Sequence, residues 1–222
     1  MHINPKLVKH YLSNVMFING TSYAGKSTMC QMLADRYGLI HCEENYDCIP
    51  EGIVTAEEYP NLGYMQTVRS SGDWRGFVSR SPEEYGAWII GSSRELVEFE
   101  LTYLMHNARR GRLIVDTNLP ADVLHQIADY NQVAIMLTTP EISRAHFFER
   151  DDDKPWFLEQ IQKLEDPAWG LENFTSCMAH INSQEAFDAW MNSGFFTLVR
   201  QDVVSDTKEQ TLQTLAKHFG LT

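Results

Sequence analysis

The sequence contains no long hydrophobic run. The apolar stretch nearest its start, residues 15–18, is only four residues long. A membrane-spanning helix needs about 20 apolar residues, and the core of a signal peptide needs about 7–15. The sequence therefore predicts a soluble, cytoplasmic protein that makes no membrane contact.

Cysteine is also sparse, with only Cys30, Cys42, Cys48 and Cys177. No two of them form a C-x-x-C pair, and their spacing is not that of a disulfide framework. Reduced thiols are what an intracellular protein is expected to carry.

Positive charge is in short supply: 18 lysines and arginines face 30 aspartates and glutamates, for a net charge of −12. Proteins that bind nucleic acid in general usually present a basic face to the phosphate backbone. The charge balance therefore disfavours nucleic acid as a partner.

The chain has no internal repeat, low-complexity tract or linker. At 222 residues its length suits one α/β domain with insertions. We expect residues 1–222 to form a single domain.

What the sequence does have is a complete Walker A pattern, G-x-x-x-x-G-K-[ST], at residues 20–27. It follows the apolar run 15–18 and precedes a segment with helical periodicity, which is the strand–loop–helix context of a phosphate-binding loop. Loop amides and the helix N-terminus would bind phosphate oxygens, Lys26 would reach the β- and γ-phosphates, and Ser27 would ligate Mg²⁺. The predicted nucleotide-binding residues are Gly20, Thr21, Ser22, Tyr23, Ala24, Gly25, Lys26, Ser27 and Thr28.

Strands and helices alternate along the chain. The predicted strands are 15–18, 39–42, 111–116, 133–137 and 195–199, and the predicted helices include 26–37, 94–109, 118–130, one beginning at Pro140 and a last one opened by an Asp206–Glu209 capping box. Continuous apolar strands alternating with helices indicate a parallel sheet covered on both faces.

Two stretches exceed what a crossover helix requires. Residues 43–110 are expected to be an inserted substrate-binding helical region, and residues 144–193 a lid and helical insertion.

Acidic residues stand at two predicted strand ends, where open parallel sheets bind their ligands. Asp116 follows a buried strand and is the expected second group of the Mg²⁺ site, although it could instead cap the next helix. After the second strand, Asp47 and Glu44, ahead of Glu43, are candidates for the base that deprotonates a substrate hydroxyl.

Arginines supply two further hypotheses. Arg144 and Arg150 flank a charged segment that could close over the γ-phosphate as a lid, or could be an exposed charged turn. In the first insertion, arginines stand among aromatic residues, a composition that suits an anionic or planar substrate and equally an ordinary helical subdomain. They are Arg69, Arg75, Arg80 and Arg94, with Tyr64, Trp74, Phe77, Tyr85 and Trp88.

Taken together, residues 20–28, the acidic strand ends and the 144–150 segment resemble the nucleoside-monophosphate-kinase and shikimate-kinase branch of phosphate-loop proteins. The resemblance implies a three-layer P-loop NTPase fold with a five-stranded parallel sheet in the order 2-3-1-4-5. It also implies a substrate subdomain after the second strand and a mobile lid after the fourth.

The function expected from this resemblance is Mg²⁺- and ATP-dependent transfer of the γ-phosphate to a small molecule, with a hydroxyl acceptor favoured. A nucleotide kinase, or a nucleotide-binding switch or NTPase without a small-molecule acceptor, is the alternative. The sequence leaves open the acceptor, the preference between ATP and GTP, and the oligomeric state.

Overall fold

The computed structural model describes residues 3–43, 48–145, 154–200 and 207–221. Within these residues one sheet is formed by β1 (Val15–Gly20), β2 (Ile40–Cys42), β3 (Leu113–Asp116), β4 (Val133–Thr138) and β5 (Phe196–Arg200). All neighbouring strands run parallel, in the order β2-β3-β1-β4-β5. The α/β class and the predicted strand order are both confirmed.

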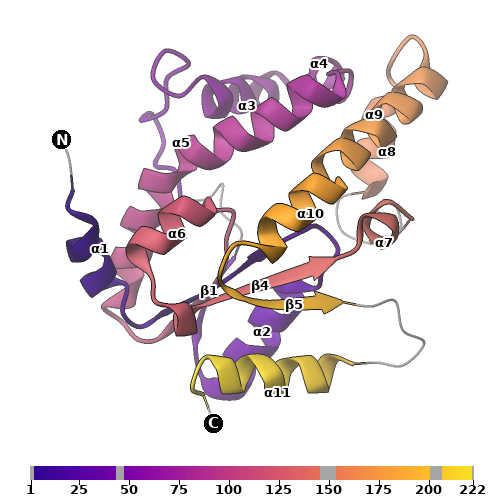
Figure 1. Ribbon diagram of the computed structural model, residues 1–222. Coiled ribbons are helices and arrows are strands. Elements are labelled where there is room, and N and C mark those ends of the chain that lie inside the picture. The colour runs from indigo at the N-terminus through magenta and orange to yellow at the C-terminus, as the bar shows by residue number, and fades with distance from the viewer. Residues whose placement is uncertain (1–2, 44–47, 146–153, 201–206, 222) are drawn as a thin grey trace.

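Helices connect the strands and cover both faces of the sheet (Figure 1). Those of the first half are α1 (Pro5–Tyr11), α2 (Lys26–Tyr37), α3 (Pro60–Ser71), α4 (Arg75–Val78) and α5 (Pro82–Ala108). Those of the second half are α6 (Ala121–Ile127), α7 (Pro140–Ala145), α8 (Lys154–Ile161), α9 (Pro167–Ile181), α10 (Gln184–Met191) and α11 (Lys208–His218), with a 3₁₀ turn, η1 (Tyr130–Gln132), before β4.

The central strands are apolar throughout because each of their two faces contacts a separate core. In β1, Val15 and Phe17 pack with α1, α6 and the end of α5, whereas Met16 and Ile18 pack with α2 and α11. Figure 1 shows α2 and α11 together on one side of the sheet and α5 and α6 on the other. Successive strand residues point to opposite faces, so both sets must be apolar.

A separate helical layer lies beyond the sheet, built from both long insertions. α3, α4 and α5 come from the first insertion, and α8 and α9 from the second (Figure 1). Their buried aromatic and aliphatic side chains form one cluster, which includes Phe77, Tyr85, Trp88, Ile161 and Phe174. The helical content expected for both stretches is present, and the two stretches pack together.

Two predicted helix boundaries are wrong. α5 begins at Pro82, twelve residues before the predicted start, behind a capping box of Ser81 and Glu84. The helix predicted over 118–130 is shortened to Ala121–Ile127, because Pro120 precedes it and Ala128 is extended. Of the capping box predicted for α11, Asp206 lies outside the described residues, and Glu209 accepts a hydrogen bond from Arg36.

Among the helices of the described residues, none is both long enough and apolar enough to cross a membrane.

Candidate functional site

The glycine loop leaves β1 in close contact with β4. Gly20 has a φ of +131°, and a Cβ there would lie 1.9 Å from the carbonyl oxygen of Met136. The Thr21 N–H donates to that same carbonyl (3.1 Å), and the Thr21 hydroxyl accepts from the Thr138 N–H (2.9 Å). Only glycine permits this approach, so the first glycine of the motif positions the loop on the neighbouring strand.

The loop then turns through two left-handed residues into α2. Tyr23 (φ +66°) is the one non-glycine residue with positive φ among those described, and Gly25 (φ +86°) precedes the first helical residue. Gly25 supplies no side-chain cap to the amides of the first helical turn. Such amides and the helix dipole together form an anion-binding site at a helix N-terminus.

Lys26 is the first residue of α2. Its ammonium group donates to the carbonyl oxygen of Thr21 over 3.3 Å, so the side chain folds back along the loop. One hydrogen bond to a backbone carbonyl holds the Lys26 ammonium group at the loop, where a phosphate oxygen could replace the carbonyl as its acceptor.

The structure brings Ser27 and Asp116 together, as the sequence predicted for a shared site. The Ser27 hydroxyl donates to Asp116 Oδ2 over 2.6 Å, and Asp116 is only 2% exposed at the end of β3. Parallel pairing of Ile18 with Asp116 places this carboxylate beside the start of the loop. The alternative role, capping the next helix, is not supported, because the residue at the N-cap of α6 is Pro120.

One hydroxyl and one carboxylate fit Mg²⁺, which keeps several waters and takes few protein ligands besides substrate phosphates. In the described part of the chain no three His, Cys, Asp or Glu side chains gather into a metal-binding cluster. The donor set therefore suits a metal that arrives with a nucleotide rather than one held by the protein alone.

Cys30 lies on α2 behind the loop and is fully buried. Burial raises the pKa of its thiol well above the usual value, and the nearby Asp116 carboxylate raises it further. The thiol therefore stays protonated at neutral pH and packs as an apolar side chain.

A buried carboxylate that the sequence reasoning missed lies next to this site. Glu100, 2% exposed on α5, accepts a hydrogen bond from the Thr117 hydroxyl (2.5 Å), which in turn accepts from the Leu119 N–H (3.0 Å). This network fixes the backbone that follows Asp116. Glu100 lies on the same helical face as Leu96, Phe99 and Tyr103. An acidic residue on an apolar face was the feature of the sequence that could have predicted its burial.

Arg144 is described, but its partners belong to its own helix. Its Nε donates to the Pro140 carbonyl (3.0 Å), and its guanidinium lies 3.6 Å from Glu141. From α7, Ser143 contacts the loop, because its hydroxyl donates to the Ser22 carbonyl (3.3 Å).

Another arginine, which the sequence did not predict to be part of the site, contacts the loop. Arg200, at the end of β5, donates to the Tyr23 carbonyl (2.9 Å), and its guanidinium carbon lies 4.9 Å from the centroid of the Tyr23 ring. Arg200, on the edge strand β5, therefore stabilises the left-handed turn at Tyr23.

Of the remaining candidates, Glu43 is exposed directly after β2, and Asp47, Glu44 and Arg150 lie outside the described residues. Their predicted roles stay predictions.

The arginines of the first insertion separate into different environments. Arg75 pairs with Asp73 (2.8 Å), and Arg94 pairs with Asp122 of α6 (2.7 Å). The hydrogen bond from Arg75 lowers the pKa of Asp73 to about 2. Arg80 instead stacks among aromatic rings, with its guanidinium carbon 4.1 Å from the centroid of the Tyr64 ring.

No protein-family model matches this chain, and a search of curated proteins returns no match. Support for a function therefore comes from the loop motif and from the geometry of its surroundings.

Proposed function

We propose that this protein is a P-loop phosphotransferase that moves the γ-phosphate of ATP to the hydroxyl group of a small molecule. The observation that carries the proposal is the pairing of Ser27 with Asp116, at 2.6 Å, beside a complete glycine loop. The loop motif and an acidic group at the end of the adjacent strand are the two parts that phosphate-loop enzymes combine.

Each residue of the loop has a distinct part in this proposal. The amides between Ser22 and Ser27 bind phosphate oxygens, and Lys26 exchanges the Thr21 carbonyl for the β- and γ-phosphates. Ser27 and Asp116 hold Mg²⁺, which when bound neutralises charge on the phosphates. Thr117 and Glu100 keep the backbone after Asp116 in place through their buried hydrogen bond.

The acceptor hydroxyl requires a base and a group that stabilises the transferring phosphoryl. Asp47 or Glu44 is proposed as the base, because both follow β2 in the sequence and parallel sheets bind their ligands beyond the carboxyl ends of the strands. Arg144 or Arg150 is proposed to contact the γ-phosphate. For Arg144 this requires the side chain to leave Pro140 and Glu141.

The test is ADP release from Mg²⁺-ATP, with GTP in parallel, across nucleosides, nucleoside monophosphates, sugars, hydroxy acids and amino alcohols. We expect at least one acceptor to raise the rate above the acceptor-free rate. Lys26→Ala should lower that rate about 100-fold or more, the scale of losing one transition-state contact, while the circular dichroism spectrum stays unchanged.

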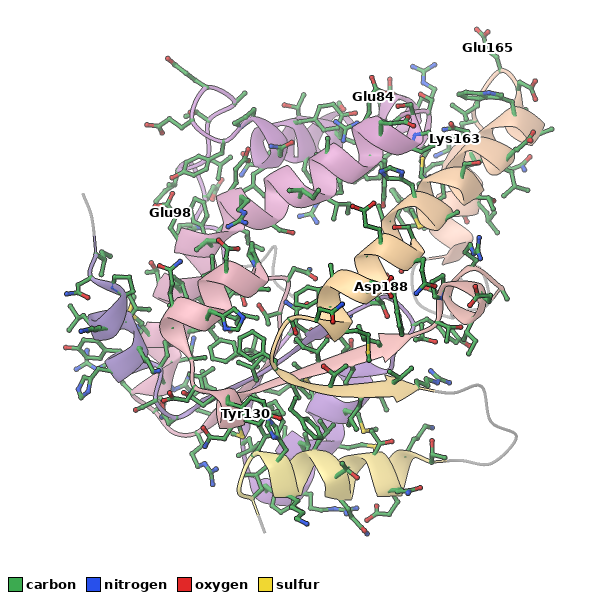
Figure 2. All side chains as sticks on the ribbon, in the orientation of Figure 1. Glu84, Glu98, Tyr130, Lys163, Glu165 and Asp188 are labelled. Carbon is green, nitrogen blue, oxygen red and sulfur yellow. The ribbon has the colours of Figure 1, made fainter. Side chains whose placement is uncertain are left out.

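Lys163→Ala is the matched control. Lys163 is exposed beyond α8, where its amine bonds Gln160 (2.9 Å), and Figure 2 labels it far from the strands. Removal of this lysine should leave the rate unchanged. A rate that no acceptor stimulates, or one that survives in Lys26→Ala, would contradict the phosphotransferase proposal.

A further inference from the structure

A pocket lies within the helical layer, between α3, α4 and the start of α5. Its volume is about 480 Å³, and its lining includes Asn61, Tyr64, Ser79, Arg80, Glu84 and Trp88. Pockets that hold small organic ligands have volumes of about 300–1,000 Å³. None of the residues that line this one belongs to the glycine loop or to a strand.

Arg80 lines this pocket with a positive charge that no described side chain pairs. Its Nη1 is buried without a hydrogen-bond partner, and the side chain has no hydrogen bond or ion pair with any described residue. A buried donor left unsatisfied is unfavourable, and more so when it carries charge. An oxyanion bound by the guanidinium would compensate its charge, which no described carboxylate pairs.

The protein holds Arg80 in place both at its backbone and at its side chain. The Arg80 carbonyl accepts from Asn173 Nδ2 (2.7 Å) and from the Cys177 thiol (3.4 Å), both on α9. The guanidinium carbon lies 4.1 Å from the Tyr64 ring centroid and 5.7 Å from that of Trp88. Stacking against the aromatic rings orients the planar fork, and less entropy is then lost when a ligand binds.

Glu84 gives the pocket a second charge of opposite sign. Its Oε2 accepts from the Ser81 N–H at the start of α5 (2.9 Å), and Figure 2 shows it at the N-terminal end of that helix, away from the sheet. Its carboxylate disfavours a polyanion and favours a hydrogen-bond donor on the ligand. Tyr64 and Trp88 contribute aromatic surface suited to a flat molecule.

We propose that this pocket binds a small planar molecule with one oxyanion, a carboxylate or a phosphate, for Arg80 and a hydroxyl or amine donor for Glu84. Binding at this pocket does not depend on the proposed phosphotransferase activity, because the residues that line the pocket lie outside the glycine loop.

Isothermal titration calorimetry of the nucleotide-free protein provides the test. The probes are 4-hydroxybenzoate, 4-hydroxyphenyl phosphate and the neutral 4-hydroxybenzamide, which all carry a hydroxyl donor for Glu84. At least one of the two anions should bind at least tenfold more tightly than the amide, and the tighter one identifies the oxyanion. Arg80→Gln should remove that preference.

Arg75→Gln is the matched control, because Arg75 is exposed on the neighbouring short helix and already pairs with Asp73. This variant should bind the probes as the wild type does. Lys26→Ala should also bind them unchanged, so loss of phosphotransfer and loss of this site are separate outcomes. The proposal is overturned if neither anion binds better than the amide, or if Arg80→Gln and Arg75→Gln behave alike.

A second variant covers the case in which Arg80→Gln does not fold. Ala87 lines the pocket and is exposed on α5, so Ala87→Trp should fill the space without removing a buried contact. We expect at least tenfold weaker binding of the preferred anion with an unchanged circular dichroism spectrum. Unchanged binding in Ala87→Trp would overturn the proposal.

Discussion

At the scale of single residues, Gly20 and Thr21 link the glycine loop to β4 through the Met136 carbonyl and the Thr138 amide. Neither contact depends on a bound nucleotide. The loop is therefore preorganised by the fold. Substitutions at Gly20, which contacts β4, and at Gly38, which does not, allow this to be measured.

Gly20→Ala should reduce the free energy of unfolding by about 3 kcal/mol or more, because both a clash and an unfavourable φ are introduced. Its Cβ would lie 1.9 Å from the Met136 oxygen. Gly38→Ala is the matched variant: Gly38 also has positive φ (+64°), but no atom beyond the adjacent residues lies within 4 Å of the position that its Cβ would take. It should lose only about 1 kcal/mol. Urea denaturation measures both, and equal losses would mean that contact with β4 does not constrain the loop.

At the scale of elements, α11 packs on the sheet through apolar side chains, and a histidine at its end adds a polar contact. His218 Nε2 lies 2.9 Å from the Val133 carbonyl, and its ring stacks on Phe196 with centroids 4.2 Å apart. Burial lowers the pKa of His218, because the charged form loses water, and its backbone hydrogen bonds offset only part of this effect.

This environment predicts a pH dependence of stability with a definite sign. The unfolded chain, with a histidine pKa near 6.5, binds a proton more readily than the folded protein does. Stability should be constant above about pH 6.5 and should fall as the pH drops below it. In His218→Gln this part of the pH dependence should disappear, whereas His10→Gln, at an exposed position on α1, should keep it. Melting temperatures between about pH 5 and 8 provide the measurement, and identical profiles for both variants would contradict the assignment.

At the scale of the whole molecule, two stretches separated by β3, β4 and the segments around them join in one helical layer. Phe174 of α9 is completely buried there and contacts Tyr85 of α5 and Phe157 of α8, with ring centroids 5.7 and 5.0 Å apart. The sheet has its own two cores, in which Phe17 is completely buried. The helical layer could therefore loosen while the sheet stays folded.

Phe174→Ala should destabilise this layer by about 3–5 kcal/mol, the usual cost of emptying a buried aromatic site. Hydrogen exchange should then accelerate in α4, α8, α9 and the first half of α5, and much less in β1, β3 and β4. Phe17→Ala, the matched change in the sheet core, should accelerate exchange in the strands instead. Uniform acceleration in both variants would show that layer and sheet unfold as a single unit.

The parts that the sequence predicted correctly are those with local causes. Gly38, following an apolar helical stripe, ends α2 as expected, and the predicted apolar strands 15–18 and 133–137 lie within buried strands. The encounter of Ser27 with Asp116 was also predictable, since carboxyl ends of parallel strands meet at one edge. The strand order followed only from the family resemblance.

Tertiary structure decided everything whose partner lies far along the chain. Residues 82–93 pack against α9 and α3 rather than against the sheet. Their apolar positions therefore did not continue the stripe that predicted the helix over 94–109, and the start at Pro82 was missed. Glu100 is buried because Thr117 lies opposite it, and Arg80 forms its aromatic stack because Tyr64 of α3 packs against it. Glycine, helix caps and apolar periodicity act on neighbours within a few residues, whereas burial and pairing of a charged side chain depend on which distant element packs over it.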